Sequence, residues 1–479
     1  MEALAALEGI RYDPSRLERL SSVLAPPYDV VSLPAARQYL ARSPYNVLRL
    51  DLGLREEDAS VTPGDWQHAG SLFRSWMEQG VLKPDPGPCA YVMRHHYRAP
   101  DGTEGTLVAA FAGLRVGQGP GRAALPHERT LQEVWSERLR QLQVCRAHFS
   151  PILALLADPA GAVREALEQA CQRPPDAAGE APSGGQLELW AYPVDEAPGR
   201  RVMDAMAASL ADHPAIIADG HHRFEAASRL AELEGGRGAV QYILAGLTSL
   251  EHGGLAVLPI HRMVGPATPT VQERLRLRLY EYLMPVAHAE LPQGLQEQLG
   301  RAGADPRRAA ELVRAVRAAL GRTAVAVYWG RGAVEFLAEP AKAAWRSRNS
   351  RPELPGAAND VLLLHRGPLA DWELLAELPG TASRAGQQPQ ERAGPGWVAF
   401  SPVAEEAARE VDEGRAAAAI FVSPVTLADV KEVAVAGKRM PQKSTYFYPK
   451  LTSGLVLADL GRAVLPWPWP AGQKLGKEG

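Results

Sequence analysis

Short apolar runs bounded by glycine, proline or polar clusters alternate along the chain with segments of helical spacing. Runs rich in β-branched or apolar residues predict strands, which are expected at Tyr45–Leu50, Ala90–His95, Thr106–Leu114, Leu187–Tyr192, Ala215–Ala218, Ala239–Ala245, Ala324–Tyr328 and Ala417–Val422. Apolar positions that share one face predict helices over residues 65–79, 130–145 and 403–414. Because strands and helices interleave throughout, the pattern predicts a mixed α/β (α+β) fold.

Three stretches rich in proline, glycine, alanine and polar residues interrupt this pattern, at residues 172–185, 287–310 and 378–396. Such composition is typical of linkers or surface insertions. The tail from Pro466 onward is expected to be frayed and disordered, and we find no internal repeat.

Composition narrows the class of protein. The 479 residues carry a formal net charge of −3, which argues against a protein that coats nucleic acid or anionic membrane. Three widely separated cysteines predict neither a disulfide framework nor a cysteine zinc site. The first residues include acids where a signal peptide needs bases, and no apolar run is long enough to span a bilayer. We therefore expect a cytoplasmic protein of unknown oligomeric state.

Lysine is scarce, and four of the eight lysines fall between residues 431 and 450. The local cluster indicates either a need for ammonium groups there or chance on a solvated surface. The segment 439–450, RMPQKSTYFYPK, also combines hydroxyls with three aromatic residues. It fits either a pocket for phosphate or carboxylate groups or a packed surface loop.

The stretch AIIADGHHRFEAA, residues 215–227, combines a predicted strand, an Asp-Gly turn and the start of a helix. The first turn of a helix offers free N–H groups and a partial positive charge, and the Arg223 guanidinium can bind phosphate oxygens. Asp219 could hold Mg²⁺ or accept a proton, or it could merely cap the helix. His221 and His222 point to different helix faces, so they do not converge on one metal ion.

The segment LPHERT, residues 125–130, places His127 and Glu128 just before a predicted helix. Glu128 is a candidate general base. The alternative is a first-turn glutamate that stabilises the helix through its dipole.

Polar residues also stand within apolar context in APPYDVVS (25–32) and SPYNVLRLD (43–51). They either line a site or tie the N-terminal segment down by hydrogen bonds, and His261 and Arg262 could add charge near the same site. The polar residues in question are Tyr28, Asp29, Asn46 and Arg49.

The motifs APPYDVVS, SPYNVLRLD, LPHERT, ADGHHRFEAA, LPIHRMV and MPQKSTYFYPKLTSGL occur in one order, and together they resemble the bacterial domain of unknown function 1015 family from about residue 10 to residue 460. More distantly, the Pro-His-Glu and DGHHR motifs and the segment 442–445 resemble the free serine kinases. No P-loop, GxGxxG, GxSxG or HExxH motif stands in a suitable context.

The kinase resemblance implies a ParB/sulfiredoxin-like core with an N-terminal extension and a C-terminal α/β domain. The corresponding expected division is residues 1–120, the core at 121–265, a helical connection at 266–310, a C-terminal domain at 311–465 and the tail at 466–479.

The same resemblance implies roles for individual residues. Glu128 looks like the catalytic base, and Asp219 looks like a second catalytic or Mg²⁺-handling carboxylate. The implied phosphate cradle is Gly220, His221, His222 and Arg223, with His127 beside it. The implied substrate side is Lys443, Ser444, Thr445 and Tyr446, although Tyr446 and Phe447 replace the Arg and His that follow this segment in the kinases.

These implications support a small-molecule phosphotransferase that uses ATP or ADP with Mg²⁺, a kinase acting on an alcohol group. The alternative is a ParB-like regulatory protein that binds a nucleotide without catalysis. A metal hydrolase that uses His127, His221 or His222 is the weakest hypothesis, because the spacing matches no familiar ligand set.

Overall fold

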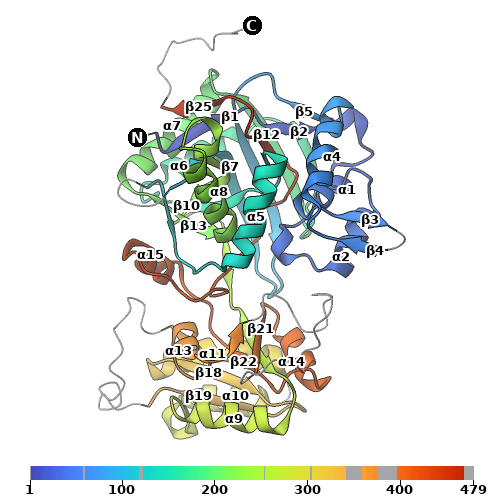
Figure 1. Ribbon diagram of the computed structural model, residues 1–479. Coiled ribbons are helices and arrows are strands. Elements are labelled where there is room, and N and C mark those ends of the chain that lie inside the picture. Colours follow the sequence, from blue (N-terminus) through green and yellow to red (C-terminus); the bar gives the residue numbers. More distant parts are fainter. Residues whose placement is uncertain are drawn as a thin grey trace. The chain divides into compact units, whose positions relative to one another are not determined.

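The computed structural model describes residues 2–57, 60–117, 122–252, 254–302, 305–340, 359–374 and 396–468. The chain forms two compact units (Figure 1). The first contains Met1–Ala256 and Phe447–Gly479, and the second is the intervening Val257–Tyr446. The second unit is therefore an insertion into the first, which differs from the sequential division expected from the sequence.

A ten-stranded mixed sheet forms the centre of the first unit. Its strand order is β11 (Ala177–Glu180), β12 (Gln186–Pro193), β6 (Cys89–Arg98), β1 (Leu4–Leu7), β7 (Glu104–Arg115), β14 (Tyr242–Ser249), β10 (Ile152–Leu156), β13 (Ala215–Asp219) and β8 (Ala124–Pro126), with β25 (Val464–Trp467) paired to β1. Strands from both expected N-terminal domains belong to this one sheet, with β6, β1 and β7 lying between strands of residues 121–265. Residues 1–120 and 121–265 thus share a single core.

The first unit has five longer helices, of which α5 packs beside α8, α6 beside α7, and α4 against α5 (Figure 1). They are α4 (Trp66–Glu78), α5 (Gln132–Cys145), α6 (Ala162–Ala170), α7 (Ala197–Asp212) and α8 (His221–Leu233). The core contains fully buried Trp190 and Phe224, together with Trp467 from the returning C-terminal segment. Burial of such large apolar side chains is the main favourable term for this unit.

Shorter elements complete the first unit. They are α1 (Leu20–Val23), α2 (Leu33–Leu40), α3 (Leu48–Asp51), and the paired strands β2 (Ile10–Tyr12) with β5 (Leu82–Pro84), β3 (Arg55–Glu57) with β4 (Ser60–Thr62), and β9 (Ala147–His148) with β24 (Ala458–Asp459).

The second unit has a seven-stranded sheet in the order β17 (Met284–Pro285), β19 (Val334–Ala338), β18 (Ala324–Tyr328), β22 (Ala418–Phe421), β16 (His261–Gly265), β21 (Trp397–Ser401) and β20 (Glu373–Leu374). Alternate residues of β18 belong to separate apolar clusters, Ala326 to one and Val325 to the other. Because successive strand side chains point to opposite faces, both faces of this sheet are covered. The α-helices among the described residues of this unit are α9 (Pro269–Tyr280), α10 (Gln293–Ala302), α11 (Pro306–Leu320), α13 (Asp360–Arg366), α14 (Ala404–Asp412) and α15 (Leu427–Val435).

The mixed α/β class is confirmed, and so are most expected elements, but the strand expected at Tyr45–Leu50 is wrong. There the Asn46 Oδ1 atom accepts the Leu48 N–H at 3.1 Å, and the chain turns into the short helix α3. An asparagine side chain that bonds its own backbone two residues on favours a turn over a strand.

The expected linkers also contain regular structure. Residues 172–185 include β11, and residues 287–310 include α10 and the start of α11. At the tail, Pro466 and Trp467 belong to β25, so fraying from Pro466 is wrong for those residues. Residues 378–395 and 469–479 lie outside the described residues. Among the described residues, no helix has the length and apolarity needed to cross a membrane.

Candidate anion-binding site

Strand β13 ends at Asp219 and helix α8 begins at His221, as the sequence predicts for this stretch. Gly220 between them has φ 88° and ψ 30°, a left-handed conformation that favours glycine. A Cβ atom at Gly220 would lie 2.7 Å from the Ile152 Cγ2 atom and 3.1 Å from the Arg223 Cζ atom. Gly220 at the N-cap position has no side chain to cap the helix, and helix N-termini of this kind bind anions.

Arg223 folds back over this turn. One of its terminal nitrogens donates to the Pro151 carbonyl oxygen at 2.5 Å, and the other donates to the Asp219 Oδ2 atom at 2.8 Å. The Arg223 side chain is only 8% exposed. Its Nε atom is buried without a hydrogen-bond partner among the residues that the structure describes. A buried donor in this state costs free energy that an incoming acceptor would recover.

Asp219 lies between two cations, because its Oδ1 atom pairs with the Lys450 Nζ atom while its Oδ2 atom pairs with Arg223. All three side chains are at least 88% buried. Burial alone would raise the pKa of Asp219, but the Lys450 ammonium and the Arg223 guanidinium together hold it well below its usual range. The carboxylate is therefore ionised at neutral pH, with both oxygens engaged.

This arrangement does not fit a magnesium ion at Asp219, because a cation there would have to displace two buried positive charges from the same carboxylate. Within the described parts of the chain, no group of three or more His, Cys, Asp or Glu side chains is gathered to hold a metal ion. We therefore derive no catalytic step through a metal at this carboxylate.

The loop that carries Glu128 lies beside the turn because β8 runs parallel to β13, with Pro126 opposite Ile217. The His127 Nδ1 atom contacts the Ile217 carbonyl oxygen at 2.7 Å, so this nitrogen carries the hydrogen. The His127 Nε2 atom stands 3.8 Å from the Glu128 Oε1 atom. The Glu128 carboxylate is thus held close to the start of helix α8, with a side-chain exposure of 12%.

His221 and His222 hold the same loop from the other side. The His127 N–H donates to the His221 Nε2 atom at 3.3 Å, and the Leu131 N–H donates to the His222 Nε2 atom at 3.0 Å. A ring nitrogen that accepts a hydrogen bond cannot carry a proton, so each Nε2 is unprotonated. The two rings therefore brace the residues on either side of Glu128, whereas the kinase resemblance implies a cradle for phosphate.

The N-terminal segment also reaches Arg223. The Tyr28 ring centroid lies 5.9 Å from the Arg223 Cζ atom and 4.3 Å from the Arg138 Cζ atom. Burial raises the pKa of Tyr28, so its hydroxyl keeps its proton. Asp29 lies near enough to Arg223 to help keep the pKa of that guanidinium raised against the opposing effect of burial.

Asn46 and Arg49 behave differently from Tyr28. The Asn46 amide donates to the carbonyl oxygens of Ser22 at 2.9 Å and Leu24 at 3.2 Å, and its side chain is fully buried. These bonds tie the N-terminal segment together, which is one of the two roles that the sequence leaves open. Arg49 is half-buried on α3.

The remaining expected residues belong to the second unit. Arg262 is fully buried there, and it donates to the Lys443 carbonyl oxygen at 3.1 Å. The Ser444 hydroxyl donates to the Pro441 carbonyl oxygen at 2.6 Å, while Ser444 and Thr445 are buried and Tyr446 is half-buried.

His261 is also enclosed in the second unit. Burial lowers the pKa of His261 to about 3, and its Nδ1 atom accepts the Val422 N–H at 3.4 Å. Its ring meets the Phe421 ring edge to face, with centroids 5.1 Å apart. His261 therefore lies in this unit as a neutral, packed side chain.

The family described as "Protein of unknown function (DUF1015)" matches residues 4–342. This chain belongs to the DUF1015 family. No curated protein matches the DUF1015 protein significantly.

Solved structures similar to the DUF1015 protein include a free serine kinase in complex with AMP, at 13% identity and a TM-score of 0.33, covering 71% of this chain and 86% of that one. Another is SbnI with a C-terminal truncation from Staphylococcus aureus, at 8% identity and a TM-score of 0.33, covering 73% and 88%. A third is a conserved hypothetical protein from Pyrococcus furiosus, at 12% identity and a TM-score of 0.30, covering 72% and 92%. Similarities this low assign no role to any residue of the DUF1015 protein.

Two residues beside Arg223 in the DUF1015 protein are missing from the candidate site residues named from the sequence. Lys450 stands outside the expected substrate residues, but it ends the segment 439–450, which fits a phosphate or carboxylate pocket, and it belongs to the lysine cluster. Asp51 is buried, and its carboxylate oxygens accept from the hydroxyls of Ser150 and Ser453 at 3.3 Å each. Burial raises the pKa of Asp51, against the opposing charges of Arg138 and Arg223. Asp51 ends the SPYNVLRLD motif, but it is not among the candidate residues named there.

Proposed function

We propose that this protein is a small-molecule phosphotransferase that binds a nucleotide phosphate at the start of helix α8. The observation that carries the proposal is the left-handed turn at Gly220, over which the buried Arg223 side chain folds with its Nε atom unpartnered among the described residues. Helix N–H groups, a glycine that admits close approach and a guanidinium are the groups that bind phosphate oxygens.

The choice of a nucleotide rests on the resemblance of the Pro-His-Glu and DGHHR motifs to the free serine kinases. The solved free serine kinases hold AMP or ADP. ATP or ADP is accordingly the proposed donor, and the proposed acceptor is a small metabolite with a hydroxyl group. Tyr446 and Phe447, which replace the Arg and His of the kinases, favour an acceptor other than serine.

Glu128 is the proposed general base. Its loop is fixed by the Ile217 carbonyl oxygen on one side and by His221 and His222 on the other, which supports a precisely held carboxylate. In the proposed step, the acceptor hydroxyl oxygen forms a bond to the terminal phosphorus as the bond from phosphorus to the leaving diphosphate or monophosphate breaks. The hydroxyl proton passes to Glu128. Catalysis of this kind depends on positioning and charge stabilisation.

Asp219 takes no proton in this proposal, because its ionised carboxylate pairs with Arg223 and Lys450. The same observation favours a second candidate, a regulatory protein that binds a nucleotide without chemistry. A site whose second acid is neutralised by two cations binds anions but has one carboxylate fewer for catalysis. The two candidates differ in the role of Glu128.

The test measures binding and turnover separately. Calorimetric titration of the wild-type protein with ATP and ADP should detect binding, and Arg223→Ala should abolish it. Incubation with each nucleotide and a panel of hydroxylated metabolites should release ADP or AMP. Glu128→Gln should retain affinity within about threefold and lose turnover by roughly 10²–10⁴-fold, the usual contribution of a general base.

The possible outcomes separate the two candidates and test the role of Glu128. Binding without turnover by the wild-type protein on any acceptor supports the regulatory candidate. Turnover by Glu128→Gln within a few-fold of wild type removes Glu128 as the base. Absence of binding by ATP and ADP refutes both candidates.

A further inference from the structure

We infer that Lys450 is a second ligand of the anion at this site, and that Asp219 holds its ammonium group beside Arg223 so that both cations bind one diphosphate group. This inference rests on the proposed function and deepens it, since it assigns a ligand-binding role to a residue outside the implied substrate segment, residues 443–446. The chemical class of the ligand is a pyrophosphate-type anion, free or as part of a nucleotide.

The position of Lys450 is fixed by its neighbours in the chain. The Phe447 ring lies 6.2 Å from the His127 ring, measured between centroids. The Tyr448 hydroxyl donates to the Ser183 carbonyl oxygen at 3.0 Å, and its ring meets the Tyr97 ring at 5.3 Å. The segment that carries Lys450 is therefore packed within the first unit, with Phe447 beside the loop that carries Glu128.

The residues that follow are held equally well. Ser453 exchanges two backbone hydrogen bonds with Ala25, at 2.9 and 3.4 Å, and its hydroxyl donates to the Asp51 carboxylate at 3.3 Å. Lys450 thus stands in a buried segment with anchors before and after it. Because the backbone of this segment is held on both sides of Lys450, the position of its side chain is restricted. The Lys450 ammonium group pairs with the Asp219 carboxylate.

Two cations and the start of a helix lie together at this site. Lys450 and Arg223 flank one ionised carboxylate, and all three side chains are nearly enclosed. Asp29 and Asp51 also act on the Arg223 guanidinium. The Arg223 Nε atom has no hydrogen-bond partner among the described residues, and the positive end of helix α8 favours an anion beside it.

Asp219 in this view arranges the two cations. Because one oxygen faces Lys450 and the other faces Arg223, the carboxylate sets the spacing of the ammonium and guanidinium groups. Two cations with a fixed spacing suit a diphosphate better than a single phosphate, since each can bind one phosphoryl group.

The experiment separates anion binding from a purely structural ion pair. Inorganic pyrophosphate and ADP are titrated calorimetrically into wild-type protein, Lys450→Gln and Lys450→Arg at one ionic strength. The glutamine amide can still donate to Asp219 but has no charge. Lys450→Gln should weaken pyrophosphate binding at least about tenfold, and Lys450→Arg should bind within about threefold of wild type.

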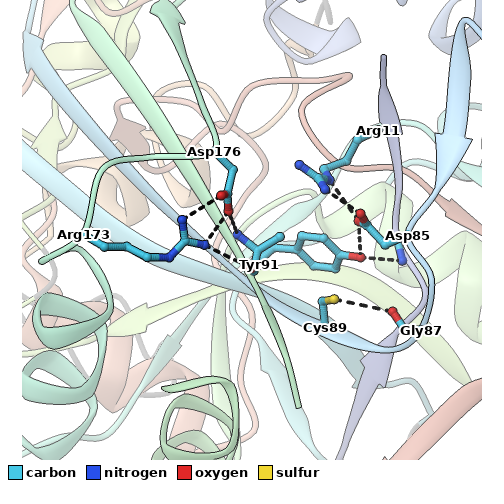
Figure 2. A network of polar contacts seen from close by, with 9 residues as sticks. Arg11, Asp85, Gly87, Cys89, Tyr91, Arg173 and Asp176 are labelled. Carbon is cyan, nitrogen blue, oxygen red and sulfur yellow. Dashed lines mark hydrogen bonds and ion pairs between the residues drawn. The ribbon is translucent and has the colours of Figure 1, made fainter. Parts of the chain in front are cut away.

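A matched control breaks an ion pair elsewhere in the first unit. Figure 2 shows Arg11 paired with Asp85, whose carboxylate also accepts from the Tyr91 hydroxyl, in a network that contains none of the residues of the anion site. Arg11→Gln should lower the melting temperature and leave pyrophosphate affinity within twofold. If Lys450→Gln behaves in the same way as Arg11→Gln, Lys450 is structural and the inference is overturned.

A measurement on wild-type protein covers the case in which Lys450→Gln does not fold. The chain has eight lysines, so ¹³Cε-lysine labelling gives a short list of signals. Pyrophosphate should shift the Lys450 signal, assigned by its loss in Lys450→Arg, and an unmoved signal at saturation overturns the inference.

The two proposals fail in different ways. If pyrophosphate binds and its binding depends on Lys450 while ADP does not bind, the role of Lys450 as an anion ligand is supported and the nucleotide function is refuted. ADP binding that does not depend on Lys450 refutes the inference and leaves the function standing. If the wild-type protein binds neither ligand, both are refuted.

Discussion

The substitution Gly220→Ala tests the turn on which the site depends. Gly220 has φ 88°, where an alanine costs about 1–2 kcal/mol relative to its preferred conformations. The new Cβ atom would also stand 2.7 Å from the Ile152 Cγ2 atom, on a strand residue that is fully buried. Carbon atoms prefer separations of about 3.5–4.0 Å, and overpacking of a core costs about 1–3 kcal/mol.

Gly161 provides a matched control. It precedes helix α6 with φ 75° and ψ 14°, nearly the same left-handed conformation at the same helix position. A Cβ atom at Gly161 would have the Arg164 side chain as its nearest neighbour, at 3.8 Å, which is ordinary van der Waals contact. Gly161→Ala therefore incurs the backbone strain alone, partly offset by about 0.4–1 kcal/mol because alanine restricts the unfolded chain.

The expected loss in free energy of unfolding is about 0.5–1.5 kcal/mol for Gly161→Ala and about 2–4 kcal/mol for Gly220→Ala. Equilibrium urea unfolding of both variants, followed by far-ultraviolet circular dichroism, gives the difference, and pyrophosphate titration should show lost binding only for Gly220→Ala. If the two variants lose the same stability within about 0.5 kcal/mol, the close contact with Ile152 is not the constraint on this turn.

Three further predictions concern other parts of the first unit. His222→Leu removes the acceptor for the Leu131 N–H and should speed hydrogen exchange of that amide about fivefold, by loss of about 1 kcal/mol, while His222→Gln should restore protection. Burial lowers the pKa of His148 to about 4 from an ordinary value near 6.5, so the folded state binds fewer protons than the unfolded state between these pH values. The contribution of His148 to the free energy of unfolding is therefore fully present above pH 6.5 and falls by up to about 3 kcal/mol towards pH 4. His148→Gln should remove this pH dependence in unfolding measurements. Asn46→Ala breaks three hydrogen bonds of the buried Asn46 side chain and should lower the free energy of unfolding in urea by about 2 kcal/mol. The affinity for ADP should not change, and a loss of affinity would indicate that Asn46 contacts the ligand.

Local patterns predict much of this fold. The helix over residues 65–79 appears as α4, with Asp65 accepting the His68 N–H at 2.9 Å, and the strand at Ala324–Tyr328 appears with those bounds. Both follow from spacing within a dozen residues. The turn at Gly220 is predicted for the same reason, because Asp219 and Arg223 are four positions apart and meet through local geometry.

Contacts between distant parts of the chain are the ones that local patterns miss. Lys450 joins Asp219 from 231 positions away, and only the sheet order and the returning segment bring them together. Asp51 likewise meets Ser453 across 402 positions. The single sheet shared by residues 1–120 and 121–265 is missed for the same reason, since hydrogen bonds between strands leave no mark in the periodicity of either strand.

The insertion of Val257–Tyr446 into the first unit sets the order in which a ribosome can complete that unit. A ribosome adds about 5–20 residues per second, so the insertion occupies on the order of ten to forty seconds between the last strand before it and the segment after it. During this interval the nascent chain has Asp219 and Arg223 but not Lys450, and β1 has not yet received β25, whose Trp467 lies opposite Leu4. Strand β1 still pairs with β6 and β7, but the edge that β25 later covers is open, and an open strand edge of apolar residues is prone to association with other chains. We therefore expect this edge of β1 to be the part of the nascent first unit most exposed to association until β25 emerges.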